Sequence, residues 1–345
     1  MTVRTRRASA ARQSAQATPL AARVFGRLAD GEFHSGEALA AALAVSRSAI
    51  WKAVRSLRKL GVVLFAVRNR GYRLLHSGEP LDQEAIHVQL DDDVRGHVTR
   101  VEALWSTSST NTRLLERANP AGGTSEVVLA EYQTSGRGRR GRAWLAPPGG
   151  AICLSLSWTF LAVPADLGAL GLVVGVCSLR ALRGLGVQTA RLKWPNDLLI
   201  GDAKVAGVLI DLRAESAGPA CVVIGIGVNV TLGPPLLTRI AATGTRATDL
   251  VSAGLAPSSR NAVAAALIGE CVRGLGEFER QGLRPFIEEW RTADALRGRA
   301  VTVQAADNVA RGVARGIDLH GALVVETPHG IERFISGDVT VRAPA

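Results

Sequence analysis

Positive charge is concentrated at one end of this chain, and this limits the architectures open to it. Residues 1–75 contain 14 lysines and arginines but 3 aspartates and glutamates, whereas residues 76–345 contain 27 of each sign. The whole excess of +11 therefore lies in the N-terminal part. A small basic module joined to a neutral body predicts that the first part binds a polyanion and the second has another task. The plainer alternative is a solvated surface with a bias toward arginine.

Size and cysteine usage restrict the class of protein further. With 345 residues, 47% of them hydrophobic, the chain can bury the cores of two or three domains. The 4 cysteines stand singly, which indicates neither a disulfide framework nor a zinc site and favours a reducing, cytoplasmic location. No apolar run approaches the roughly 18 residues of a membrane helix, so we expect no membrane span. Residues 1–18 resemble a transit peptide in composition, but we interpret them as a disordered basic tail.

The basic module has the pattern of a winged helix-turn-helix, expected over residues 19–76. Helical spacing covers 20–29, 37–43 and 47–60, and a β-hairpin over 62–75 follows. The polar face of the third helix would enter a DNA groove and the hairpin tip would contact phosphates. A helical protein-interaction domain is the alternative. The expected DNA-binding residues are Ser46, Arg47, Ser48, Lys52, Arg55, Arg68 and Arg70.

The remaining chain reads as a mixed α/β domain over 77–295, followed by a small β-barrel over 296–345. Helices are expected at 111–118, 166–185 and 261–279, and strands at 127–132, 152–158, 205–212 and 222–230. After residue 296 the runs are short, β-prone and broken by turns. The fold class is therefore α+β with several domains.

An arginine–glycine segment, from Gly136 to Arg142, is the most informative stretch for chemistry. Four arginines alternate with three glycines directly after an expected strand. Such a backbone is soft and repels itself, and a bound anion would order it through guanidinium and N–H hydrogen bonds. We expect a loop that closes over a phosphate-bearing ligand; an arginine–glycine tail for nucleic acid is the alternative.

Lysine is rare in this chain, which makes two of its positions conspicuous. There are 4 lysines against 37 arginines, and Lys193 and Lys204 lie in one short region. A compact ammonium suits a transferring phosphoryl group, and Asp197 between them could hold Mg²⁺. Two surface lysines at strand ends would explain the same pattern. Hydroxyl and amide groups at 108–111 could bind a polar head group or cap a helix, and the glycines at 225–227 would allow a ligand close to the backbone.

In order along the chain, AEYQTSGRGRRGRAW, LKWPNDLLI, DAKVAGVLI, VIGIGVN and ARGID closely resemble the motifs of biotin protein ligases. With the N-terminal module, residues 20–342 resemble the bifunctional form that is also a biotin operon repressor. The resemblance implies a class II synthetase-like central domain and a C-terminal SH3-like barrel. It also implies that biotin and Mg-ATP form biotinyl-5′-AMP, and that a lysine of a biotin carboxyl carrier protein then takes the biotin.

The resemblance also assigns residue roles. It implies catalytic roles for Arg139, Lys204, Lys193 and Asp197, with Mg²⁺ on Asp197. ATP and Mg²⁺ would be placed by Lys193, Asn196, Asp197 and Asn229. Biotin and its adenylate would be bound by Ser109, Thr110, Asn111, Gln133, Arg137, Gly138, Arg139, Lys204 and Gly207.

Regulation follows from the same resemblance. Ligand-ordered loops would pair two subunits, and the homodimer would present two winged helices to operator DNA. One departure is visible: residues 243–250 contain no aromatic residue to contact adenine. The alternatives are a monofunctional biotin ligase whose winged helix does not repress, a ligand-sensing transcription factor without ligase activity, and a lipoate ligase.

Overall fold

The computed structural model describes residues 18–76, 78–214, 220–256, 260–305, 308–335 and 337–341. The chain separates into two compact units, Met1–Ser77 and Gly78–Ala345, which are considered one at a time. The basic tail expected over residues 1–18 lies outside the described residues, except for Thr18. The boundaries proposed between domains stay predictions.

The N-terminal unit contains the predicted three helices and hairpin. Ser35 and Ser46 cap the second and third helices, each side chain accepting from the backbone N–H three residues ahead. Ile50, Val54 and Leu57 form the buried face of the third helix, as their spacing predicts. The elements are α1 Leu20–Leu28, α2 Gly36–Leu43, α3 Arg47–Lys59, β1 Leu64–Val67 and β2 Gly71–Leu74.

A seven-stranded sheet is the centre of the second unit, with strand order β3-β4-β5-β9-β8-β7-β6. The β3–β4 pair is parallel, and every other neighbouring pair is antiparallel. The strands are β3 Val98–Thr107, β4 Ser125–Gln133, β5 Ala151–Phe160, β6 Ala190–Lys193, β7 Asp197–Ile200, β8 Ala203–Ala214 and β9 Ala220–Asn229. The four predicted strands are confirmed as β4, β5, β8 and β9 with ends shifted by one or two residues, whereas β3, β6 and β7 were not predicted.

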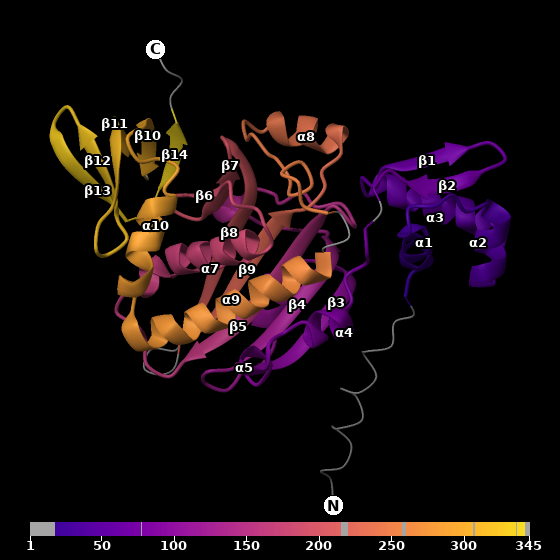
Figure 1. The fold of residues 1–345 in the computed structure, drawn as a ribbon, viewed down its shortest axis with the longest axis horizontal. Coiled ribbons are helices and arrows are strands. Elements are labelled where there is room, and N and C mark those ends of the chain that lie inside the picture. Colours follow the sequence, from indigo (N-terminus) through magenta and orange to yellow (C-terminus); the bar gives the residue numbers. More distant parts are fainter. Residues whose placement is uncertain are drawn as a thin grey trace, which may run out of the picture. The chain divides into compact units, whose positions relative to one another are not determined.

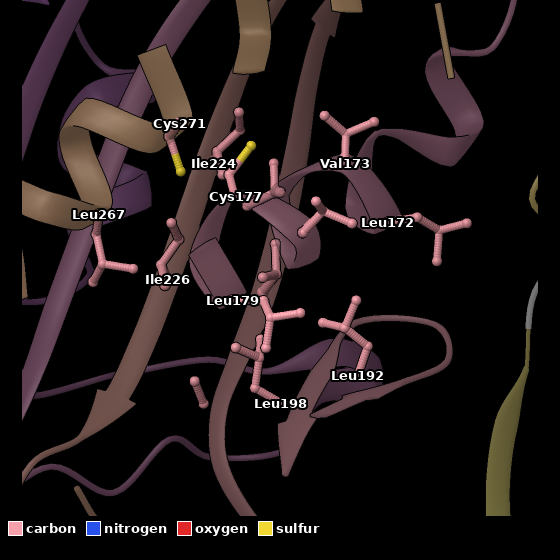
Figure 2. Packing of buried hydrophobic residues seen from close by; sticks show 14 of the residues in the cluster. Leu172, Val173, Cys177, Leu179, Leu192, Leu198, Ile224, Ile226, Leu267 and Cys271 are labelled. Atoms are coloured by element: carbon pink, nitrogen blue, oxygen red, sulfur yellow. The ribbon is translucent and has the colours of Figure 1, made fainter. Parts of the chain in front are cut away.

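The two faces of this sheet are covered differently. Helices α7 Leu170–Gly184 and α9 Arg260–Gln281 pack against each other across one face (Figure 1). Ile224 and Ile226 of β9 point toward Cys177 of α7 and Cys271 of α9 (Figure 2). Alternate strand residues, such as Val223, point the other way and pack with helix α6 Thr110–Leu115. Shorter helices are α4 Gln83–Val88, α5 Asp92–Arg95, α8 Pro234–Ala241 and α10 Ile287–Ala293.

Helix α7 and the turn before it form a long apolar segment where no membrane span was expected from the sequence. The segment Leu167–Gly184 is 18 residues long and apolar enough, by length and composition, to cross a membrane. Two thirds of it, 67%, is nevertheless buried inside this unit, and core helices of soluble proteins pass the same test. It therefore carries little weight as a membrane signal.

The C-terminal part is a five-stranded antiparallel sheet with strand order β13-β12-β11-β10-β14. Its strands are β10 Ala300–Ala305, β11 Asn308–Ile317, β12 Leu323–Thr327, β13 Gly330–Phe334 and β14 Asp338–Val341. A bulge between Ala314 and Gly316 interrupts the β11–β12 register. The buried residues Val301 and Val325 belong to the same hydrophobic cluster as the large sheet, so the two sheets share a core.

Candidate active site and DNA-facing surface

A cavity of about 990 Å³ opens on the α6 face of the large sheet. Its walls come from β4, β5, β8 and β9, the turn between β6 and β7, and the segments 137–145 and 243–247. Every residue predicted to bind biotin, ATP or Mg²⁺ lines it. They are Ser109, Thr110, Asn111, Gln133, Arg137, Gly138, Arg139, Lys193, Asn196, Asp197, Lys204, Gly207 and Asn229.

The start of α6 supplies buried polar groups to the cavity floor. Ser109 caps the helix, its Oγ accepting from the Thr112 N–H at 3.4 Å, as the capping alternative requires. Thr110 donates from its backbone N–H to Gln133 Oε1 at 2.8 Å. The Asn111 amide is hydrogen-bonded to Asp211 and Ser155. Its predicted contact with biotin therefore rests on its position in the cavity and not on an unused hydrogen-bonding group.

Gly225 and Gly227 of β9 line the cavity, where close approach of a ligand to the backbone stays a prediction, and they also make room for protein side chains. A side-chain carbon at Gly225 would overlap the Asn111 amide, and one at Gly227 would overlap the Trp144 ring. Sequence reasoning missed this use of Trp144, although its position directly after the arginine–glycine segment was a signal. Trp144 is an aromatic residue that lines the cavity, whereas residues 243–250 contain none.

The arginine–glycine segment has a defined backbone and divergent side chains. Gly138 donates its N–H to the Arg142 carbonyl at 2.6 Å, and Trp144 donates to the Gly136 carbonyl at 2.9 Å. These bonds order a segment for which the sequence predicted only a soft, self-repelling loop. Arg137 donates to Thr112 Oγ1 at 3.1 Å, on the α6 side of the cavity.

Arg139 turns to the opposite wall. Its Nη1 lies 3.4 Å from Asn196 Oδ1 and 3.4 Å from the Gly337 carbonyl of the C-terminal sheet region. The neighbouring Arg140 donates to the Gln304 carbonyl at 3.3 Å. Arginines therefore stand on two walls, so positive charge faces the cavity from two sides.

The KWPND segment is a tight connection between β6 and β7. Lys193 ends β6 and pairs in register with Asp197, the first residue of β7. Across the next strand pair, Lys204 Nζ lies 2.5 Å from Asp197 Oδ1 and 5.6 Å from the centre of the Trp144 ring. The predicted magnesium ligand is thus also the counter-ion of the predicted catalytic ammonium.

Asn229 lies at the cavity edge, where it joins two backbone segments. Its Nδ2 donates to the carbonyl oxygens of Lys204 at 3.3 Å and Thr248 at 3.0 Å. This brings the segment containing Arg246 alongside the start of β8, where the Lys204 N–H donates to the Arg246 carbonyl. Arg246 lines the cavity and was not anticipated from the sequence.

The described residues of this site include neither a group of metal-ligating side chains nor a reactive thiol. Among the residues that the structure describes, no group of three or more His, Cys, Asp or Glu side chains could hold a metal ion. Burial raises the pKa of the Cys153 thiol to about 12, so this cavity-lining cysteine stays protonated near neutrality. All four cysteines are free and buried.

The N-terminal unit presents a separate polar surface. Arg47, Ser48, Lys52 and Arg55 are exposed on α3, as predicted, while Ser46 caps this helix. Trp51 is missing from the predicted set, yet it is 54% exposed on this face and stacks with Arg55 at 5.5 Å. Arg47 pairs with the exposed Glu37 at 2.9 Å.

The predicted wing is an antiparallel hairpin, and Arg68 is exposed at its turn. Arg70 lies with its guanidinium 4.2 Å from the centre of the Phe33 ring. This stacking holds one arginine of the tip against the turn that precedes α2, without neutralising its charge.

Three comparisons bear on these two surfaces. Residues 104–229 match the model of the biotin/lipoate A/B protein ligase family, residues 25–73 match an HTH domain, and residues 297–342 match the biotin protein ligase C terminal domain. The bifunctional ligase/repressor BirA of Salmonella typhimurium is 37% identical over 92% of this chain and 95% of its own length.

A second BirA protein and a solved biotin protein ligase structure are also similar to this chain. The BirA protein of Escherichia coli is also 37% identical, over 92% of this chain and 95% of its own length. A biotin protein ligase from Aquifex aeolicus, solved in complex with biotin and ATP, superposes with a TM-score of 0.57 and 27% identity. That superposition covers 72% of this chain and 99% of the Aquifex chain.

Proposed function

This chain belongs to the biotin/lipoate A/B protein ligase family, and on that premise we propose that it is an ATP-dependent biotin protein ligase that also represses transcription. In the first step a biotin carboxylate oxygen attacks the α-phosphorus of ATP, and pyrophosphate leaves. In the second, a lysine ε-amine of a biotin carboxyl carrier protein attacks the resulting acyl carbon, and AMP leaves. The acceptor and the cytoplasmic location follow from the family and the cysteine usage.

The observation that carries the proposal is the convergence of two kinds of group in one cavity. Arg137 and Arg139 of the arginine–glycine segment and Lys204 of β8 bring positive charge, and Thr110 and Gln133 line the floor with small polar groups. Both steps need a negative α-phosphate to be neutralised while the reacting carboxylate is held in place. A lipoate ligase would share the α/β body but should lack the arginine–glycine segment.

The roles proposed for the cavity-lining residues are those that the family resemblance implies. Arg139 and Lys204 stabilise charge at the α-phosphate, and the segment around Gly138 excludes water from the adenylate. Ser109, Thr110, Asn111, Gln133 and Gly207 would surround biotin. Lys193, Asn196 and Asn229 would place ATP.

Mg²⁺ fits this donor set as an ion brought in with ATP. Mg²⁺ is commonly held by one or two carboxylates together with substrate phosphates and water. Asp197 is a cavity-lining carboxylate that would hold the ion, and its neighbour Lys204 would contribute positive charge beside the phosphate chain. The ion would neutralise charge on the phosphate chain.

Repression is the second activity we propose. The exposed basic face of α3, with Lys52 and Arg55, and the arginines of the hairpin suit a DNA groove and its phosphates. Biotinyl-5′-AMP would act as co-repressor by pairing two chains on a two-fold operator. A monofunctional ligase that carries a winged helix, and a ligand sensor without ligase chemistry, are the competing functions.

Biotin-dependent exchange of labelled pyrophosphate into ATP tests the ligase directly. We expect exchange by the wild type and a loss of about 100-fold or more in Arg139→Ala and Lys204→Ala, because each removes a charge at the transition state. Arg315→Ala, which removes an exposed arginine paired with Glu326 in the C-terminal sheet, should exchange like the wild type. A folded wild type that does not exchange would refute the ligase and favour the ligand sensor.

A further inference from the structure

A chain of polar side chains runs beneath the cavity floor, from Asp211 of β8 to Thr110 of α6. Asn111 Nδ2 lies 2.8 Å from Asp211 Oδ2. Ser155 Oγ lies 2.5 Å from Asn111 Oδ1 and 2.6 Å from Thr110 Oγ1. Ser155 is fully buried, and neither it nor Asp211 lines the cavity. The two residues therefore act on a bound molecule only through their neighbours.

Asp211 fixes which way the Asn111 amide faces. The Asp211 carboxylate accepts hydrogen bonds, and so does the Leu209 carbonyl 3.4 Å from the same nitrogen. With the amide reversed, its oxygen would face two acceptors. The nitrogen therefore faces Asp211, and Oδ1 faces Ser155.

This orientation decides where two hydroxyl hydrogens go. Asn111 Oδ1 can only accept, so the single hydrogen of Ser155 must be donated to it. Ser155 then has no hydrogen for Thr110, and the 2.6 Å contact between their oxygens requires Thr110 to donate. The Thr110 hydroxyl hydrogen is thereby drawn down into the floor, and its oxygen keeps lone pairs for the cavity.

A second acceptor stands beside that oxygen. Gln133 Oε1 is 3.2 Å from Thr110 Oγ1 and accepts from the Thr110 backbone N–H at 2.8 Å, an obligatory donor that fixes the glutamine amide. Two oxygens with lone pairs thus face the same point at the floor. Such a pair suits an N–H donor from a ligand and disfavours a carbonyl.

We propose that Asp211 and Ser155 are positioning residues that hold Thr110 as a hydrogen-bond acceptor for an N–H group of the ligand. The inference rests on the proposed function, in which that group is an N–H of the biotin ureido ring. It adds two residues outside the cavity wall that decide specificity through the direction of hydrogen bonds.

The test measures biotin affinity by calorimetry, with KM and kcat for pyrophosphate exchange, in single and paired variants. Ser155→Ala frees the Thr110 hydrogen to turn to Gln133 Oε1 or toward the ligand, and in either case one of the two acceptors is lost. We therefore expect Kd and KM for biotin to rise about 10-fold with kcat within twofold. Asp211→Ala should raise them by a smaller factor, because Leu209 still holds the Asn111 amide. Asp211→Asn keeps an acceptor oxygen and should bind biotin like the wild type.

Paired variants separate this role from general loosening of the fold. Thr110→Val removes the acceptor itself, so adding Ser155→Ala to it should weaken binding by no more than about twofold further. Glu326→Ala on β12 serves as an unrelated control. If Thr110→Val and Ser155→Ala weakened biotin binding independently, so that their factors multiplied, the inference would be overturned. Wild-type biotin affinity in Ser155→Ala would overturn it as well. Either result would leave the proposed function intact. A wild type that neither binds biotin nor exchanges pyrophosphate would overturn the proposed function with it.

Discussion

Removal of the buried Arg260 guanidinium should destabilise the second unit strongly. Arg260 Nη2 lies 2.9 Å from Glu131 Oε2, with exposed fractions of 0% and 5% for the two side chains. Its two Nη atoms also donate to the Glu79 and Ala151 carbonyls, each at 2.9 Å. Glu131 in turn accepts from the Gly149 N–H at 3.1 Å. This pair therefore joins the start of the unit to β4 and to the start of β5, the strands that precede and follow the arginine–glycine segment.

Arg260→Met would keep most of the buried volume and leave the Glu131 carboxylate without its counter-ion. Breaking a buried ion pair on one side typically costs about 3–5 kcal/mol, because the remaining charge is uncompensated. We expect a loss of this size in the free energy of unfolding of the second unit. Urea denaturation at pH 7, followed by tryptophan fluorescence, measures it.

Two further variants make the test specific. Arg273→Met, in the same helix, removes an exposed arginine that pairs with Asp91 and Asp93 and should cost about 1 kcal/mol or less. Arg260→Met combined with Glu131→Gln removes both charges and should recover part of the lost stability. A single-variant loss no larger than that of Arg273→Met, or a double variant as unstable as the sum of both changes, would refute the reasoning.

Three further outcomes are expected. Burial raises the pKa of Asp294 from 3.8 to about 6, so its contribution to stability is full below about pH 4 and is lost as pH rises through 6. The unfolding free energy of Asp294→Asn relative to wild type should therefore increase from pH 4 to pH 7, by about 3 kcal/mol in total, and a pH-independent difference would contradict this. Gly227→Ala should displace the Trp144 ring and reduce pyrophosphate exchange about 10-fold or more, whereas unchanged exchange would show that the ring position is unimportant. Arg55→Ala should make the negative slope of the log of the duplex-DNA binding constant against log salt less steep by about 1, without changing pyrophosphate exchange. An unchanged slope would show that Arg55 of α3 does not contact DNA phosphates.

The local pattern of the sequence was sufficient for the elements of the N-terminal unit and for helices α6, α7 and α9 and strands β4, β5, β8 and β9 of the second unit, but it missed β3, β6, β7 and the short helices α4, α5, α8 and α10. Helix α3 forms where Ile50, Val54 and Leu57 recur at helical spacing after a serine cap, and these signals act within one turn or two. The scarcity of lysine predicted a functional role for Lys193 and Lys204, because the type of charged residue can be read from the sequence alone. The resemblance to a family then placed motifs from distant parts of the chain in one site.

The roles of individual groups within that site depended on strand pairing. Asn111 contacts Gly225 and Asp211 because β8 and β9 lie beside each other under α6, although these residues are separated by about 100 positions in the chain. Pairing of β7 with β8 brings Lys204 to Asp197, and the Trp144 ring lies on Gly227 of β9. Whether two groups form a hydrogen bond or overlap depends on differences in distance of a few tenths of an ångström, and the periodicity of a sequence contains no information at that scale. Residue types and their spacing therefore determine which elements form, and close packing across the sheet determines which groups remain available to a ligand.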